Sequence, residues 1–416
     1  MKNLYLQGVE KTDNKHILIR GVKYLDFTSG NFLGLKNHEK LKEAGKKAID
    51  LYGLDSEVVP VNSKAIDIYL EVKTEITKLK KQEDTILYNS GYNLNAGVIP
   101  TIFDKDDVIF SDSQNFIELY QGIYRSGAHL VRYKHNNIED LKNKLEKNRG
   151  KFKKAGVVTD TIFNTDGQKA NLKEIANLKK DFDFIFIVDE SNADGIYGGD
   201  LGGIVLEQKV EDEVDLVIGS FAKNLGVLGE YVSGKVDYIN LLMKNSLNKN
   251  IFYKSVMTPI FINSLKTALD IIKDEEERRE RVINYSQKIR EELMRMGFDI
   301  AHSESHIIPI VFNKNEEAIL LSKFLYKNGI LVSTNIAKNT IKPRIKLYIS
   351  TLLEEEDIEI LIKSLNEFKE KNEVKKEDEN EIIEIKKEEL DNLLKTPEDE
   401  EVIDEELLED LTIENE

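Results

Sequence analysis

Residues 215–226 read DLVIGSFAKNLG, an apolar run that leads to a single basic side chain, Lys223. The apolar and branched residues over 216–221 follow the pattern of a buried strand. Lys223 comes just past the end of this run, and Gly226 and Gly229 let the backbone bend close to a ligand. We therefore expect a strand that presents one amine at its carboxyl end, where a lysine is a candidate Schiff-base nucleophile.

A second apolar run, DFIFIVDE, ends in the acidic Asp189, 34 residues before Lys223. A carboxylate at that end can face the ring nitrogen of a cofactor, and a Schiff-base lysine beside such a carboxylate indicates pyridoxal phosphate. Phosphate binds to backbone N–H groups and hydroxyls at a helix start, and Ser90, Gly91 and Tyr92 follow another strand-like run with that arrangement. The residues therefore predict a pyridoxal-phosphate site.

Strand-like and helical stretches alternate along the chain from about residue 63. The stretches IEDLKNKLEKN and LKEIANLKK have helical periodicity and lie between strand candidates. This order is typical of an α/β fold with a mostly parallel sheet and helices on both faces, whose ligands bind at the carboxyl ends of the strands. The strand candidates cover residues 85–88, 108–110, 130–133, 156–161, 184–189 and 216–221.

The pattern changes along the chain divide it into four expected segments. We expect an N-terminal arm over 1–50, a large cofactor-binding domain over 51–258 and a small α+β domain over 259–370. The tail, 371–416, carries −14 of the formal net charge of −17. It is either a solvated, mostly disordered appendage or a partly helical segment that binds a protein partner, because the spacing of its Ile and Leu residues permits an amphipathic helix.

Composition argues against several classes of protein and site. The chain has no Cys, which excludes disulfides, thiolate catalysis and Cys-ligated metals. Its apolar runs are far shorter than the ~20 residues that span a bilayer, and no leader-like segment opens the chain, so we expect a cytoplasmic protein without membrane contact. The body without its tail is near neutral and has no basic stripe, which argues against nucleic acid. His302 and His306 precede an apolar run, so we interpret them as a strand entrance rather than a metal site.

The ordered set of motifs resembles the α-oxoamine synthase family. These pyridoxal-phosphate enzymes of fold type I include glycine acetyltransferase, 8-amino-7-oxononanoate synthase, 5-aminolevulinate synthase and serine palmitoyltransferase. The resemblance extends from about Leu25 to Lys363 and implies a homodimer whose subunits have a mostly parallel seven-stranded sheet and a small C-terminal α+β domain. The motifs, in the family's order and spacing, are NFLGL, YNSGYNLNAGVI, DVIFSD, VRYKHNNIEDL, TDTIFNTDG, IVDESNADGIYGG, GSFAKNLG and RIKLYIS.

The resemblance implies roles for individual residues. Lys223 matches the lysine that holds the cofactor and then moves the α-proton, and Asp189 matches the carboxylate that pairs with the pyridine nitrogen. Ser220 and Ser255 stand where the family usually has phosphate-contacting threonines, the second of which reaches across the dimer interface. Asn31 matches an asparagine that contacts the amino-acid carboxylate.

Other matched positions carry different residues, and these gather on the active site. Phe116 replaces the histidine that stacks on the cofactor ring, and Asn192 replaces the histidine that bonds to the ring hydroxyl. Asn164 and Ala222 each replace a serine. Lys346 replaces the arginine that binds the substrate carboxylate, and a lysine keeps the charge but loses the planar bidentate fork.

The resemblance implies a pyridoxal-phosphate-dependent acyltransferase that condenses a small amino acid with an acyl-CoA and releases carbon dioxide. The replaced residues keep two alternatives open. One is a catalytically impaired or non-catalytic homologue that serves as a scaffold or regulatory partner. The other is an enzyme that keeps the cofactor but runs another reaction, such as that of an aminotransferase or a lyase.

Overall fold

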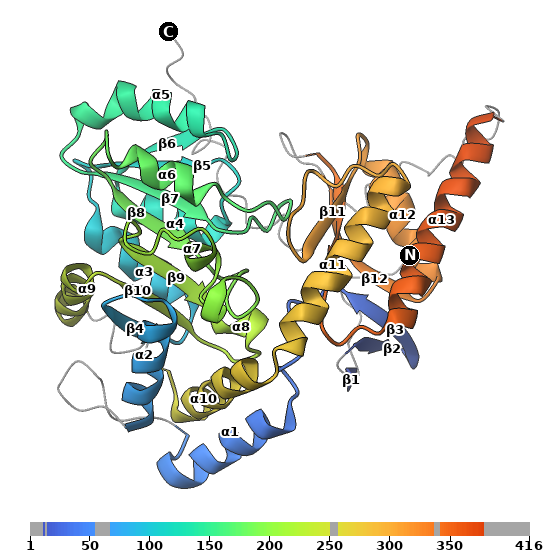
Figure 1. Cartoon of the computed structure of the whole chain (residues 1–416), viewed down its shortest axis with the longest axis horizontal. Coiled ribbons are helices and arrows are strands. Elements are labelled where there is room, and N and C mark those ends of the chain that lie inside the picture. The colour runs from blue at the N-terminus through green and yellow to red at the C-terminus, as the bar shows by residue number, and fades with distance from the viewer. Residues whose placement is uncertain (1–10, 13–14, 55–66, 250–256, 337–341, 378–416) are drawn as a thin grey trace.

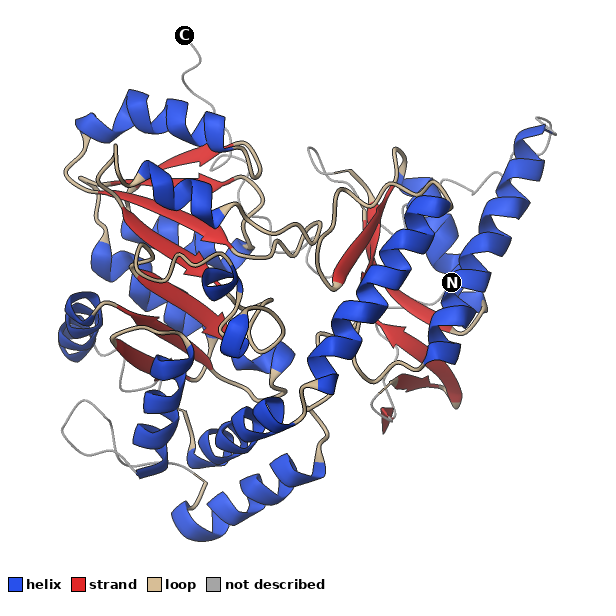
Figure 2. Ribbon diagram, in the orientation of Figure 1, coloured by secondary structure: helices blue, strands red, loops and turns tan. Residues whose placement is uncertain are grey.

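The structure is a computed structural model, and it describes residues 11–12, 15–54, 67–249, 257–336 and 342–377 (Figure 1). These residues form two bodies, one built on a seven-stranded sheet and the other on a six-stranded sheet (Figure 2). Helix α11 (Glu277–Arg295) extends from the larger body to the smaller one. Within the described ranges, no helix is long and apolar enough to cross a membrane.

The larger sheet has the strand order β4-β10-β9-β8-β7-β5-β6. Strands β5 to β9 pair in parallel, whereas β10 (Glu230–Gly234) lies antiparallel between β4 and β9. The predicted α/β fold with a mostly parallel sheet is therefore confirmed. The other strands are β4 (Asp84–Tyr88), β5 (Val108–Asp112), β6 (His129–Tyr133), β7 (Ala155–Asp160), β8 (Ile185–Asp189) and β9 (Leu216–Ser220).

Helices bury both faces of this sheet. Successive residues of a strand point to opposite faces, so Val157 and Val158 of β7 enter different core clusters, as do Val188 and Ile187 of β8. One cluster includes residues of α2, α5, α6 and α10, and the other includes residues of α3, α4 and α9. The helices are α1 (Glu39–Tyr52), α2 (Asp67–Leu79), α3 (Gly91–Ile102), α4 (Ile117–Ser126), α5 (Ile138–Asn148), α6 (Leu172–Leu178), α7 (Ile204–Glu207), α8 (Phe221–Asn224), α9 (Val236–Lys249) and α10 (Pro259–Asp274).

The smaller sheet joins the two ends of the described chain. Its strand order is β1-β2-β3-β12-β13-β11, and β3 pairs in parallel with β12. Residues of α11, α12 (Asn315–Lys327) and α13 (Glu355–Glu377) pack against it in a separate core cluster. Its strands are β1 (Lys11–Thr12), β2 (His16–Ile19), β3 (Val22–Phe27), β11 (Ile307–Val311), β12 (Ile330–Asn335) and β13 (Arg344–Tyr348).

Three details differ from the sequence-based expectation. The strand expected over 216–221 ends at Ser220, because Phe221 already begins the short helix α8. Strand β10 is missing from the expected strands, since it is short, begins with a charged residue and ends in a glycine. The helix α13 continues past residue 370 to Glu377, and the expected tail beyond that point lies outside the described residues.

Candidate functional site

The candidate site lies at the carboxyl ends of the central parallel strands. Asp160 ends β7, Asp189 ends β8, and the two residues are paired in register. Ser220 ends β9 and caps α8, with its hydroxyl accepting the N–H of Ala222 at 3.3 Å. Because α8 starts directly at the end of β9, Lys223 stands at the same edge of the sheet as the two aspartates.

The Lys223 amine lies between an amide and an aromatic ring. Nζ donates a hydrogen bond to Oδ1 of Asn192 at 2.8 Å and lies 5.3 Å from the centre of the Phe116 ring. The aliphatic part of the lysine packs on Gly30, where an added Cβ would lie 3.2 Å from Cγ of Lys223. Glycine at position 30 therefore leaves room for the lysine side chain.

Both neighbours of the amine are held by groups at the strand ends. Asn192 donates from Nδ2 to the carbonyl of Ile162 at 2.9 Å, which directs Oδ1 toward the lysine. The N–H of Phe116 donates to Oδ2 of Asp160 at 2.9 Å, which fixes the residue that precedes α4. The structure thus brings Phe116, Asn192 and Lys223 together.

Asp189 is anchored by hydrogen bonds to its backbone and to its carboxylate. The N–H and hydroxyl of Thr161 donate to its carbonyl at 2.9 and 3.0 Å, and the N–H of Ser191 donates to Oδ1 at 2.8 Å. Burial raises the pKa of the Asp189 carboxyl above its ordinary value, while the bonds from Ser191 and the charge of Lys223 act in the opposite direction. A cationic group placed against this carboxyl would favour its ionised form.

Basic and aromatic residues of β13 face the turn that contains Asn164. Lys346 donates from Nζ to the Asn164 carbonyl at 3.1 Å, and the Tyr348 hydroxyl donates to Oδ1 of Asn164, also at 3.1 Å. Burial, together with the charges of Lys223 and Arg344, lowers the pKa of Lys346 to about 8. Lys346 is therefore a titrating cation near the Lys223 amine.

Asn31 connects the N-terminal loop to the end of β13. Its side-chain Oδ1 accepts the N–H of Lys36 at 3.1 Å, and its carbonyl accepts the hydroxyl of Ser350 at 2.8 Å. The residue is only 7% exposed, so these bonds hold it firmly. Its contact with a substrate carboxylate stays a prediction.

The predicted phosphate-binding residues stand where β4 leads into α3. Ser90 precedes the helix, Gly91 begins it, and the backbone of Tyr92 lies in its first turn. Backbone N–H groups at a helix start favour an anion. Ser255 lies outside the described residues, so its contact with phosphate across a dimer interface stays a prediction.

Two glutamates that the sequence patterns do not single out reach the same place. Oε1 of Glu230 accepts the hydroxyl of Ser220 at 2.9 Å, and Oε2 of Glu118 lies 2.8 Å from the position of a Cβ built on Gly91. Burial raises the pKa of both carboxyls, and it raises that of Glu230 well above the ordinary value. The sequence offers a weak signal for Glu230, which directly follows Gly229 and begins an otherwise uncharged stretch.

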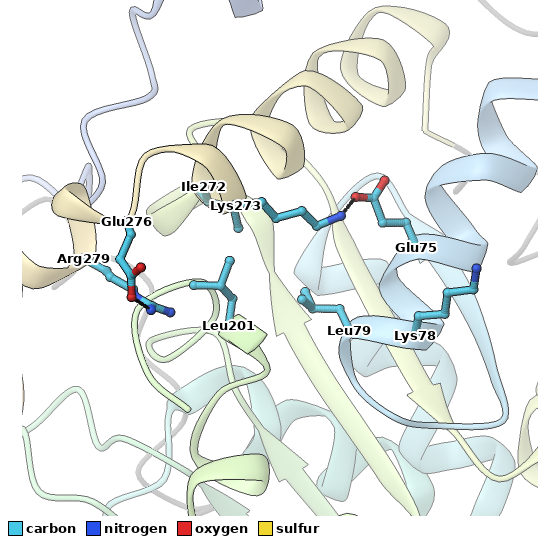
Figure 3. Close-up of a pocket in the computed structure, with 8 residues that line it drawn as sticks. All are labelled: Glu75, Lys78, Leu79, Leu201, Ile272, Lys273, Glu276 and Arg279. Atoms are coloured by element: carbon cyan, nitrogen blue, oxygen red, sulfur yellow. Dashed lines mark hydrogen bonds and ion pairs between the residues drawn. The ribbon is translucent and has the colours of Figure 1, made fainter. Parts of the chain in front are cut away.

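A cavity of about 470 Å³ lies elsewhere, between α2 and α10 (Figure 3). Ion pairs cross or border it, Lys273 with Glu75 and Arg279 with Glu276. None of the predicted site residues lines this cavity. The groups with catalytic chemistry therefore gather at the strand ends and not in this cavity.

Known proteins are similar to this chain in sequence and in fold. The model of the aminotransferase class I and II family matches residues 22–365. A putative 8-amino-7-oxononanoate synthase from Bacillus cereus is 34% identical over 330 residues, which cover 79% of this chain and 82% of that protein.

Solved structures agree with this fold. The serine palmitoyltransferase of Sphingomonas wittichii has a TM-score of 0.82 at 22% identity, over 89% of this chain and 93% of that one. A serine palmitoyltransferase from S. paucimobilis with bound pyridoxal phosphate and myriocin has a TM-score of 0.78 at 22% identity, over 86% and 90%. With the family match and the Bacillus relative, these likenesses lead to one conclusion. The chain belongs to the aminotransferase class I and II family and, within it, to the α-oxoamine synthases, a group of pyridoxal-phosphate-dependent acyltransferases.

Proposed function

We propose that this chain condenses a small amino acid with an acyl-CoA, with release of carbon dioxide, using pyridoxal phosphate as its cofactor. The observation that carries the proposal is the Lys223 amine, held between Asn192 and Phe116 at the same strand edge as Asp189. A lysine amine beside a ring-pairing carboxylate is the arrangement that this cofactor uses. The Bacillus relative is named a putative 8-amino-7-oxononanoate synthase, and membership of the α-oxoamine synthases supports the reaction class.

The residues around Lys223 fit this cofactor at three places. Burial raises the pKa of Asp189, and a protonated ring nitrogen beside its carboxyl would stabilise the ionised form. Asn192 offers an amide to a ring hydroxyl, and Phe116 offers an aromatic face on which the ring can stack. When bound, pyridoxal phosphate supplies an electron sink for a carbanion at the substrate α-carbon.

Lys223 has two tasks in this proposal. Its Nζ would hold the cofactor, and a free Nζ at this position would accept the α-proton of the substrate. The 2.8 Å hydrogen bond to Asn192 orients the amine for both tasks, since Asn192 is itself fixed on the Ile162 carbonyl. Phe116 can neither donate nor accept a proton, so it takes no part in this proton transfer.

Lys346 and Asn31 form the proposed carboxylate end of the substrate site. Lys346 presents a single point charge near Lys223, and its position is fixed by the bond to the Asn164 carbonyl. Asn31 is held by Lys36 and Ser350 on the neighbouring loop and strand end. A carboxylate bound by one lysine is less rigidly oriented than one bound by the fork of an arginine.

We also propose that the enzyme is a homodimer, as the family resemblance implies. Light scattering of the purified chain checks the assembly, with the mass of two chains as the expected result. A monomer that still binds the cofactor would contradict the dimer and leave the reaction untouched.

The visible absorption of the purified protein tests the cofactor. We expect a yellow band after addition of pyridoxal phosphate in the wild type and in Lys142→Ala, which removes an exposed lysine of α5. The band should be absent in Lys223→Ala, because the amine at the strand edge with Asp189 is then missing. A protein that stays colourless with added cofactor overturns the proposal.

The reaction itself is tested by adding glycine, alanine or serine and then acyl-CoA. We expect the band to change with one of these amino acids, followed by release of free CoA thiol and carbon dioxide in equal amounts. Formation of a keto acid without any use of acyl-CoA would point to an aminotransferase. No spectral change with any of the three amino acids would count against acyl transfer.

A further inference from the structure

The part of the site at the start of α3 contains carboxyl groups of the protein itself. The first turn of α3 presents backbone N–H groups and the positive end of the helix dipole, which favour an anion. Beside it, the Ser220 hydroxyl donates to Oε1 of Glu230 at 2.9 Å. The hydroxyl and the helix start that would hold a phosphate thus already lie against acidic side chains.

Strand β10 places Glu230 between the two strands whose ends form this part of the site. Glu230 is paired with Ser220 of β9 on one side and with Tyr88 of β4 on the other. Its Oε1 lies 3.6 Å from the position of a Cβ built on Gly91. Because strands on both sides hold its backbone, Glu230 is a fixed part of the site.

Glu118 reaches the same point from α4, two residues after Phe116. Its Oε2 lies 2.8 Å from the Cβ position on Gly91, which is closer than real side chains approach. A residue with a Cβ at position 91 would require the Glu118 carboxyl to move away from the start of α3. Two carboxyl groups, from α4 and β10, converge on the start of α3.

We propose that Glu118 and Glu230 couple phosphate binding to protons, so that the cofactor's phosphate enters this part of the site when these carboxyl groups are protonated. The inference rests on the cofactor proposed above. A protonated carboxyl donates a hydrogen bond to a phosphate oxygen. An ionised carboxylate repels a phosphate, which carries close to two negative charges at neutral pH.

Burial and the neighbouring carboxyls favour the protonated form of Glu118 and Glu230. Burial raises the pKa of Glu230, the charges of Asp189 and Glu118 raise it further, and Ser220 and Lys223 act in the opposite direction. Burial likewise raises the pKa of Glu118, with Asp189 adding to the effect and Lys223 opposing it. Phosphate affinity is therefore expected to fall as the pH rises and the carboxyls ionise.

The test compares pyridoxine 5′-phosphate with pyridoxine, two ligands that differ only in the phosphate and lack the aldehyde that reacts with a lysine. Calorimetric titration from about pH 7 to 9 gives the ratio of their dissociation constants. In the wild type, we expect the advantage of the phosphate ligand to fall about tenfold per pH unit for each proton taken up. In Glu230→Gln and in Glu118→Gln, one fewer proton should be taken up, because an amide does not titrate. The advantage of the phosphate ligand should therefore fall less steeply with pH, by about a factor of ten per pH unit.

Calorimetric titration of the wild type in two buffers of different ionisation enthalpy gives the number of protons taken up when each ligand binds. This measurement needs no amino-acid substitution. We expect greater proton uptake with pyridoxine 5′-phosphate than with pyridoxine. Equal uptake with the two ligands overturns the proposal. The same pH slope in the wild type and in both folded variants overturns it as well.

Glu139→Gln is the matched control, since it removes an exposed carboxylate in the first turn of α5. It should leave the ratio of the two dissociation constants unchanged at every pH. Failure of the proposed cofactor chemistry gives a different result, because pyridoxal phosphate would then produce no visible band with Lys223. The pyridoxine ligands do not react with Lys223, so their ratio reports on the phosphate alone.

Discussion

Two lysines near the same sheet have opposite surroundings, and the difference separates a structural cluster from a ligand site. Lys80 is 1% exposed and forms an ion pair with Asp194, and its Nζ also donates to the carbonyl of Gly202 at 3.1 Å. The Tyr231 hydroxyl donates to the same Asp194 carboxylate at 2.9 Å. Glu190 beside them accepts the backbone N–H groups that start α7. The chain itself satisfies each of these buried groups.

Lys223 lies close enough to several carboxyl groups for its charge to influence their pKa values. Within the described part of the chain, its Nζ forms no ion pair, and its hydrogen-bond acceptor is the neutral amide of Asn192. Burial raises the pKa of three carboxyls, and the charge of Lys223 acts to lower each of them; these belong to Asp189, Glu118 and Glu230. A buried charge alone therefore does not indicate a ligand site. The feature that indicates one here is an amine without a carboxylate partner among the described residues.

The largest expected effect is on stability, in the Lys80 cluster. Lys80→Met leaves the Asp194 carboxyl buried without its cation, which should lower the free energy of unfolding by about 3–5 kcal/mol. Lys223→Met removes an amine without an ion-pair partner and should cost less than about 1 kcal/mol. Denaturant titration at neutral pH measures both values.

Lys81→Met is the control for that comparison, because Lys81 is the next residue and its side chain is 54% exposed. Its loss should change the free energy of unfolding by less than about 0.5 kcal/mol. Equal losses for Lys80→Met and Lys223→Met would show that the two clusters are alike and would remove the distinction drawn between them.

His135 extends the comparison to pH dependence, since it is a second cation, like Lys80, that is paired with carboxylates of the protein itself. Burial lowers its pKa, but hydrogen bonds to Asp112 and Asp166, both 2.9 Å long, outweigh burial and raise it to about 9. The folded-state pKa exceeds the unfolded value of 6.5, so the stabilisation is complete below pH 6.5 and is lost as the pH rises through about 9. The loss should be on the order of 3 kcal/mol.

The free energy of unfolding of the wild type relative to His135→Gln, measured from pH 6 to 10, checks this expectation. Subtraction of the variant removes the contribution of other groups that titrate in this range. A difference that stays constant with pH would mean that His135 is not held as a cation by Asp112 and Asp166.

Sequence patterns locate one of these clusters and miss the other. Lys223 and Asp189 are predictable because each follows a largely apolar run, which is typical of a strand buried on both faces. Lys80 lies in the charged stretch TKLKKQED, which reads as a solvated surface. Its burial depends on Asp194 and Tyr231, which are distant in the chain and meet it only in the folded sheet.

The sequence does not predict that the two glutamates belong to the site, because their contacts too are made by residues distant in the chain. Glu118 has the position of an ordinary first-turn helix residue, and nothing in its spacing predicts that its carboxyl meets Gly91. The position of Glu230 depends on β10, which lies antiparallel between β4 and β9 and so departs from the parallel pattern of the sheet. Local patterns specify single strands and helices, whereas these contacts depend on the order in which strands are paired.

The smallest expected effect is at Lys346, which connects the comparison to the substrate. Among the described residues Lys346 forms no ion pair, as is true of Lys223, but its pKa is lowered to about 8. The amine is charged below pH 8, so affinity for the amino-acid carboxylate should be highest there and decline as the pH rises above it. Lys346→Arg should hold the carboxylate about tenfold more tightly and keep that affinity up to pH 9, because a guanidinium is charged throughout and binds through two N–H groups. Spectral titration with the amino acid measures both dissociation constants. An identical decline in the arginine variant would assign the titration to a group other than Lys346.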